Sequence, residues 1–168
     1  LLRQAGGPER VLVTDISAPM LDEARVKLGA VPRVEFRQLD AHNLDLPPSC
    51  VDIYSISFGM KILDRARVLS EAVRVLKPGG VFYCLEAARI PNELLHRLYL
   101  AYMNWCLPLI ARVATSGDAS AYNYLLKGIH EFPRQREFSA ELRAAGFANV
   151  SHENLTLGIV AIHRGEKA

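Results

Sequence analysis

Two acidic residues follow expected β-strands in the first quarter of the chain. Asp15 comes directly after the run VLVT, and Asp40 follows VEFRQL. A carboxylate at the end of a strand can accept two hydrogen bonds from the hydroxyls of a ribose, and a second acid can accept one from an adenine amino group. The two acids therefore describe a slot for an adenosine-containing ligand. Asp is also common in turns and at helix N-caps, so a purely structural role for either acid stays open.

A third stretch of the same kind ends a strand later in the chain. Ser57, Phe58 and Gly59 follow the run VDIYSI. Parallel strands bring their carboxyl ends to one edge of a sheet, which is where ligands bind in such folds. We therefore expect the Ser57–Gly59 backbone to lie at the same edge as the two acids.

The elements that must position these residues alternate between strand and helix patterns. Short links between them favour a doubly wound, mostly parallel α/β sheet. The last two strands are joined too tightly for a crossover, so they should pair as an antiparallel hairpin. The expected strands lie at 10–17, 33–41, 51–57 and 80–89, with two more within 148–167, and the expected helices lie at 17–29, 64–80 and 134–147.

Pro78-Gly79-Gly80 should end the helix expected at 64–80 and turn the chain into the next strand. Proline cannot continue a helix, and glycine adopts positive φ without a side-chain cost. We interpret this segment as structural, supporting the ligand slot without contacting the ligand.

The bulk composition is that of a globular protein. The 168 residues are 50% hydrophobic and 23% charged, with a formal net charge of +2. No block of like charge runs past three residues, which argues against a nucleic-acid partner. The three cysteines fit no metal or disulfide spacing and are expected to be reduced, mostly buried thiols. The histidines show no metal-ligand spacing either, and His163 is expected to be a partly exposed strand residue.

Several ordered motifs resemble the ubiquinone/menaquinone biosynthesis C-methyltransferases, a family of class I S-adenosylmethionine-dependent methyltransferases. The resemblance spans essentially the whole chain and implies a Rossmann-like fold with strand order 3-2-1-4-5-7-6. It also implies S-adenosylmethionine as the cofactor. The motifs are DISAPML, LDAHNLDLP, VDIYSISFGMK, RVLKPGG, GDASAYNYL and NLTLGIVAIHRGEK.

The resemblance implies that the three strand ends together bind the cofactor. The residues that it implies for binding S-adenosylmethionine are Asp15, Ile16, Met20, Asp40, Ala41, Ser57, Phe58 and Gly59.

The family carries a glycine-rich turn after its first strand, and this sequence has no such motif. We therefore expect a single methyltransferase-like domain over 1–168 that is incomplete at its N-terminus and lacks the first, central strand. Loss of that strand predicts two half-sheets with unpaired edges. Either upstream residues exist in the native protein, or the fold serves as a catalytically inactive scaffold that binds protein or RNP partners.

The second departure from the family concerns catalysis. After the FG pair the family reads roughly [IL]-R-N-V, whereas this chain has Met60-Lys61-Ile62-Leu63. Methylation at carbon needs electron density on that carbon, and a cation beside a phenolate oxygen would stabilise the charge that supplies it. Lys61 can act as a point charge there, although it lacks the planar fork of arginine, and a surface lysine is the alternative.

The segment 91–130 corresponds to the lid and substrate pocket of the family. Leu98, Tyr102, Trp105 and Leu109 share one helical face, which suits a quinol head with a polyprenyl tail, although an ordinary helix core would show the same pattern. The hydroxyl of Tyr122 is expected to contact the ring, so Lys61 and Tyr122 are the predicted catalytic residues.

The resemblance thus predicts C-methylation of a benzoquinol or naphthoquinol precursor in quinone biosynthesis. The expected partners are a polyprenylated quinol and other quinone-biosynthesis proteins, with peripheral membrane association and a homodimer as further expectations. If the source is eukaryotic, the expected location is the matrix side of the mitochondrial inner membrane; otherwise it is the cytoplasm.

Overall fold

A computed structural model describes residues 8–114 and 132–168, with side chains over 8–105 and 132–168. The chain divides into two compact units, Leu1–Leu46 and Pro47–Ala168. Each unit is described by itself below. Tyr122 and the second half of the expected lid lie outside the described residues.

The first unit is a parallel strand pair with one helix. Strand β1 (Val11–Asp15) pairs in parallel with β2 (Val34–Gln38), and α1 (Ala18–Leu28) connects and packs against them. Ser17 occupies the N-cap position with an extended backbone and Pro19 lies in the first turn, although the Ser17 side chain makes no capping bond. The two predicted strands and the helix between them are confirmed.

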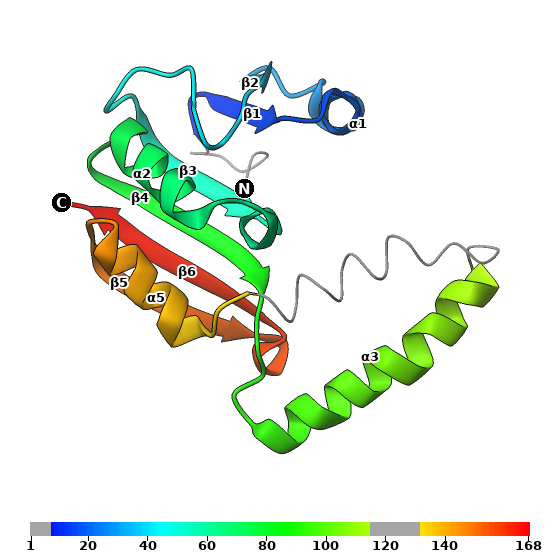
Figure 1. Cartoon of the computed structure of the whole chain (residues 1–168). Coiled ribbons are helices and arrows are strands. Elements are labelled where there is room, and N and C mark those ends of the chain that lie inside the picture. The colour runs from blue at the N-terminus through cyan, green and yellow to red at the C-terminus, as the bar shows by residue number, and fades with distance from the viewer. Residues whose placement is uncertain (1–7, 115–131) are drawn as a thin grey trace. The chain divides into compact units, whose positions relative to one another are not determined.

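The second unit is built on a four-stranded sheet with the order β3-β4-β6-β5 (Figure 1). Strand β3 pairs in parallel with β4, while β6 lies antiparallel between β4 and β5, so the predicted closing hairpin is confirmed. If β1 is counted as the second strand of the implied order, the observed neighbours are 3-2 and 4-5-7-6, as the resemblance implied. The four strands are β3 (Val51–Ser57), β4 (Leu76–Ala87), β5 (Phe147–Leu155) and β6 (Val160–Lys167).

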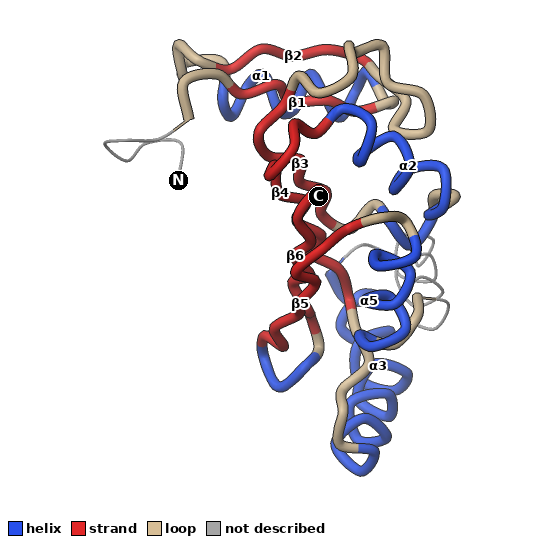
Figure 2. The backbone as a smooth tube through the Cα atoms, turned by 90° about the vertical axis from the view of Figure 1, so that its left-hand side faces the viewer, coloured by secondary structure: helices blue, strands red, loops and turns tan. Residues whose placement is uncertain are grey.

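Two helices cover one face of this sheet, as both backbone views show (Figures 1 and 2). They are α2 (Arg65–Val75) and α5 (Gln135–Ala144). Under them, the Phe82 ring stacks on Tyr54 at 5.7 Å between centroids and lies 5.3 Å from Phe147. The remaining elements of the described residues are α3 (Glu93–Ala114) and the 3-10 turns η1 (Met60–Ile62) and η2 (Thr156–Gly158).

Of the two cysteines whose side chains are described, Cys84 is buried as expected, whereas Cys50 is only partly buried. Cys50 and Cys84 are both free, and Cys84 is fully buried. Burial raises the pKa of the Cys84 thiol, and the charge of Glu86 adds to that effect. Burial also raises the pKa of Tyr54 to about 12. Both groups therefore stay protonated at neutral pH.

The predicted end of the 64–80 helix is wrong. Helix α2 ends at Val75, and Leu76 is already extended and pairs with Val51. The last two carbonyls of the helix accept hydrogen bonds from the residues that precede β3. Ser49 N–H donates to Arg74 O, and Cys50 N–H donates to Val75 O. Strand pairing thus stops the helix before the proline does.

Pro78-Gly79-Gly80 lies inside β4, in an irregular part of the ladder between Val51 and Ile53 of β3. Gly79 adopts φ +75°, and a Cβ on Gly80 would approach Lys77 O to 2.8 Å. The glycines therefore serve two different needs, one of backbone conformation and one of space.

The expected exposure of His163 is also wrong, since this residue is only 1% exposed. Strand β6 is an inner strand, and its alternate side chains face the helices. The ring of His163 stands edge-on to Phe138 at 4.9 Å, and its Nε2–H donates to Gln135 O at 3.1 Å. Burial lowers the pKa of His163 to about 4, against the opposing effect of the bond to Gln135.

This buried, neutral histidine predicts an acid-dependent loss of stability. Below pH 6.5 the unfolded chain binds a proton that folded His163 takes up only near pH 4. The free energy of unfolding should therefore fall as pH decreases across that window, by about 3 kcal/mol at most. Urea titrations at a series of pH values measure this effect. His163→Gln should flatten the dependence, and an unchanged slope in that variant would contradict the assignment.

Candidate functional site

In the first unit, the structure places Asp15 and Asp40 at the same end of the parallel pair. Asp15 is the last residue of β1, and Asp40 follows β2 by two residues. Leu39 N–H donates to Asp15 O, and the Gln38 side-chain amide donates to Ile16 O at 2.8 Å. These bonds tie the two strand ends together, so the carboxylates belong to one edge, as the sequence predicted.

Both carboxylates organise local turns. Asp15 Oδ1 accepts from Ser17 N–H at 2.8 Å, and Asp40 Oδ1 accepts from His42 N–H at 2.9 Å. Asp40 Oδ1 also lies 2.7 Å from His42 Nδ1. The turn role that the sequence left open is therefore present in both cases. In Asp15 the turn uses Oδ1, and Oδ2 of Asp15 accepts no hydrogen bond from any described residue.

The apolar side chains beside these acids are exposed. Ile16 is 63% exposed and Met20 is 58% exposed, while Ala41 is half-buried. Carboxylates next to exposed apolar side chains suit a ligand that combines hydroxyl groups with a flat aromatic ring, as an adenosine does. The hydrogen-bond acceptors of this unit therefore fit the nucleoside part of S-adenosylmethionine.

In the second unit, the chain leaves β3 through a strained residue. Phe58 has φ +54°, a conformation uncommon for residues other than glycine. Its N–H donates to Leu85 O at 2.9 Å, which extends the β3–β4 ladder by one bond. Gly59 has a negative φ and ordinary space around it, so its backbone conformation does not demand glycine. Such strain persists where the surroundings hold it and is frequent at ligand sites.

Lys61 follows on η1 and is buried rather than at the surface. Its side chain is 5% exposed, and its Nζ lies 3.6 Å from Oε1 of Glu86, whose side chain is fully buried. Nζ also lies 5.5 Å from the centre of the Phe58 ring, within cation–π range. The surface-lysine alternative is therefore excluded, and a buried cation stands at the carboxyl ends of β3 and β4.

Glu86 was missed by the sequence reasoning, although a signal was present. It follows Phe82 and Cys84 at alternate positions of β4, and all three are fully buried on the helix-covered face. An acid in that register has to be paired when it is buried. Its partner could have been sought among the cations that follow the neighbouring strand, of which Lys61 is the first.

The expected lid is helical where it is described. In α3, Leu98, Tyr102 and Trp105 are 59%, 49% and 81% exposed, so these three do not form a helix core in the described structure. The Leu109 side chain and Tyr122 lie outside the described side chains. The roles predicted for the binding and catalytic residues stay predictions.

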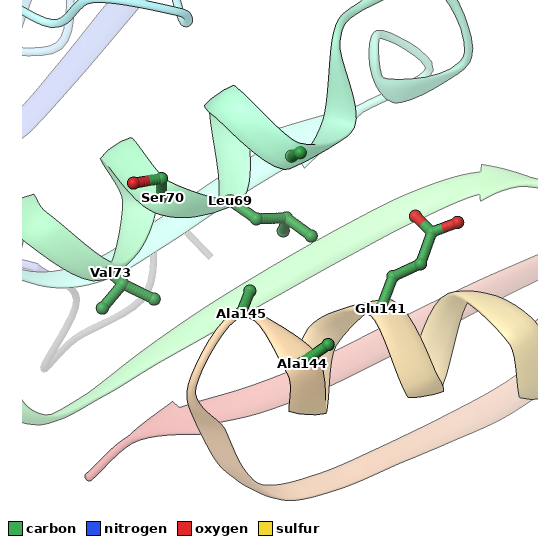
Figure 3. Close-up of a pocket in the computed structure, with 7 residues that line it drawn as sticks. Leu69, Ser70, Val73, Glu141, Ala144 and Ala145 are labelled. Atoms are coloured by element: carbon green, nitrogen blue, oxygen red, sulfur yellow. The ribbon is translucent and has the colours of Figure 1, made fainter.

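A separate groove of about 440 Å³ lies between α2 and α5 (Figure 3). It contains none of the predicted site residues. Its walls are mostly apolar or small side chains, with Glu141 as the charged one; they are Ala66, Leu69, Ser70, Val73, Glu141, Ala144 and Ala145.

The fold is that of S-adenosylmethionine-dependent methyltransferases. A methyltransferase of this class from Thermotoga maritima superposes with a TM-score of 0.66 at 20% identity, over 94% of this chain and 73% of that chain. The phosphoethanolamine N-methyltransferase 2 of Haemonchus contortus, in complex with S-adenosylhomocysteine, gives a TM-score of 0.65 at 13% identity, over 94% of this chain and 43% of that one. The predicted Rossmann-like class I fold is confirmed.

The chain belongs to the ubiE/COQ5 methyltransferase family, whose profile matches residues 1–167. It is 37% identical to the ubiquinone/menaquinone biosynthesis C-methyltransferase UbiE of Brucella anthropi, over 99% of this chain and 65% of that protein. It is 42% identical to the demethylmenaquinone methyltransferase of Clavibacter sepedonicus, over 97% of this chain and 66% of that protein. The chain therefore spans about two thirds of the length of the relatives that it matches. The methyl donor of this family is S-adenosylmethionine.

The buried pair predicts an asymmetric response to mutation. Lys61→Met should lower the free energy of unfolding by about 3 kcal/mol, because it leaves the Glu86 carboxylate buried without a cation. The double variant Lys61→Met/Glu86→Gln should recover part of that loss. Denaturant titration measures both.

Lys77→Met is the matched control, because Lys77 also lies in an ion pair that involves β4, with Asp52 of β3 at 2.8 Å, but the side chains of this pair are 46% and 78% exposed. It should cost less than about 1 kcal/mol. Equal losses in Lys61→Met and Lys77→Met would contradict the burial of the first pair.

Proposed function

We propose that this protein catalyses S-adenosylmethionine-dependent C-methylation of a benzoquinol or naphthoquinol precursor in quinone biosynthesis. The observation that carries the proposal is the family match across residues 1–167, together with a buried cation at Lys61, the position where the family pattern has its arginine. The names of the two relatives supply the substrate class.

The first unit is proposed to bind the nucleoside of the cofactor. Asp15 Oδ2 would accept from the ribose hydroxyls, Asp40 would accept from the adenine amino group, and Ile16, Met20 and Ala41 would contact the adenine ring. The backbone of Ser57, Phe58 and Gly59 completes the predicted set. When bound, S-adenosylmethionine supplies an electrophilic methyl group.

Lys61 is proposed to act on the substrate side. A quinol ring carbon becomes nucleophilic when the neighbouring hydroxyl loses its proton, because the negative charge is shared between the oxygen and that carbon. The Lys61 ammonium would donate a hydrogen bond to this oxygen and stabilise its charge in a site of low polarity. Tyr122 is proposed to contact the ring substituents, and the exposed apolar face of α3, with Leu98, Tyr102 and Trp105, to contact the polyprenyl tail.

Among the helices that the structure describes, none has the length and apolarity to cross a bilayer. We propose peripheral association with the membrane that holds the substrate, contacts with other quinone-biosynthesis proteins, and a homodimer. For a eukaryotic source we propose the matrix side of the mitochondrial inner membrane, and otherwise the cytoplasm. None of the comparisons favours the inactive scaffold over an enzyme.

The function is tested by methyl transfer in the full-length native protein. With S-adenosylmethionine and a short-tailed demethylmenaquinol under reducing conditions, mass spectrometry should detect one added methyl on a ring carbon, together with S-adenosylhomocysteine. Cofactor binding without any methylated quinol would refute the proposed substrate class. The absence of both cofactor binding and methylated product would favour the catalytically inactive scaffold.

The cofactor site is tested separately by calorimetry. Asp15→Ala should weaken S-adenosylmethionine binding on the order of a hundredfold, since two hydrogen bonds to a charged acceptor are lost. Asp15→Asn, which keeps an acceptor for Ser17 N–H, should weaken it as well. Asp45→Ala is the matched control, because the Asp45 side chain is 90% exposed. Unchanged affinity in both Asp15 variants would refute the placement of the ribose.

A further inference from the structure

Glu86 is a charged side chain that the proposed chemistry has not yet used. Its Oε1 accepts one hydrogen bond, from Ala87 N–H at 2.9 Å. Its Oε2 is buried and has no hydrogen-bond partner among the described residues. A fully buried carboxylate normally has its lone pairs satisfied, so a single hydrogen bond is an unusually poor environment for it.

The pair that Glu86 forms with Lys61 is also unusually open. The 3.6 Å between Nζ and Oε1 exceeds the 2.7–2.9 Å of a charge-assisted hydrogen bond. The more exposed pairs of the same unit are tighter, with 2.7 Å for Arg65–Glu141 and 2.8 Å for Lys77–Asp52. Lys61–Glu86 is the more deeply buried pair and would gain the most electrostatic energy from close contact, yet its charged atoms lie farther apart than those of the two more exposed pairs.

The open geometry leaves the N–H donors of the Lys61 ammonium available. None of its N–H donors makes a hydrogen bond to a described residue, and its closest anionic neighbour is Glu86. Glu86 supplies the opposite charge, which attracts the Lys61 ammonium and holds it at this end of the sheet. An ammonium held this way keeps its donors for an oxygen that arrives with a ligand.

We propose that Glu86 is a positioning residue that acts through Lys61. The buried carboxylate holds the Lys61 ammonium at the carboxyl ends of β3 and β4, with its N–H donors directed to the ionised hydroxyl of an aromatic substrate. This inference rests on the proposed function, in which Lys61 stabilises that oxygen. It explains how a lysine serves where the family pattern has an arginine, because a point charge on a flexible stem needs a counter-ion to orient it, whereas a planar guanidinium is pre-organised.

A structural role for the pair makes a different prediction. An ion pair kept for stability would gain by closing to hydrogen-bond distance and would need no free donors. Its loss would lower stability and leave the active molecules with unchanged kinetics. The two roles are therefore separated by kinetics on folded protein and by the coupling between the two residues.

The first experiment is a double-mutant cycle in the full-length native protein with a short-tailed demethylmenaquinol. Glu86→Gln keeps the side-chain volume and an acceptor for Ala87 N–H while removing the charge. It should lower kcat on the order of tenfold or more while the Kd for S-adenosylmethionine stays unchanged. In the Lys61→Met background, Glu86→Gln should lower kcat no further. Asp52→Asn is the matched control and should leave kcat unchanged, because its pair with Lys77 is exposed at the other end of the strands.

The second experiment needs no turnover and uses p-nitrophenol, whose ionised form absorbs visible light. The wild type should bind it as the phenolate, whereas Lys61→Met and Glu86→Gln should lose most of that absorbance shift. Circular dichroism on every variant restricts the comparison to folded protein, and the double variant replaces Glu86→Gln if the single variant does not fold.

The outcomes separate the two proposals. Product formation with full activity in Glu86→Gln would overturn the role of Glu86 and leave the proposed function standing. Equal losses from Glu86→Gln with and without Lys61 would show that Glu86 acts independently, and this too would overturn it. If the wild type forms no product, the proposed function is refuted, and p-nitrophenol binding alone then tests the role of Glu86. Identical spectra in wild type and Glu86→Gln, or no binding by the wild type, would then overturn it.

Discussion

One backbone hydrogen bond, from Phe58 N–H to Leu85 O, determines the geometry of the second unit's candidate site. It continues the parallel ladder beyond the last residue of β3, and the chain meets this constraint by placing Phe58 at positive φ. The turn then begins at once, and η1 brings Lys61 back beside Glu86 on the neighbouring strand. Without the parallel register of β3 and β4, the cation and the carboxylate would not share an end of the sheet.

Most of the architecture follows from local patterns that agree with one another. The β-branched runs became strands, Val68, Leu69 and Ala72 became the buried face of α2, and the short final link became an antiparallel hairpin. These features depend on neighbours in sequence, where periodicity and turn residues carry the information. The placement of Asp15 and Asp40 at one edge follows too, because parallel strands must end together.

The errors arise where distant residues decide the outcome. The end of α2 was assigned to Pro78, but pairing of Leu76 with Val51 acts earlier in the chain. His163 was assigned partial exposure because the sequence does not show that its side chain lies on the face that α5 covers. Glu86 was overlooked for the same reason, since its partner lies 25 positions away and becomes a neighbour only after the sheet forms.

The position of β6 has a consequence for synthesis of the chain. This strand comes last in the order of the sheet's elements, yet it joins β4 to β5, and the Lys167 ammonium donates to Leu76 O at 2.6 Å. On the ribosome, β3 and β4 emerge early and can pair, but β5 has no described strand partner until residues 160–167 have left the exit tunnel. The sheet therefore closes only when its last strand is available, and until then one edge of β4 lacks its partner.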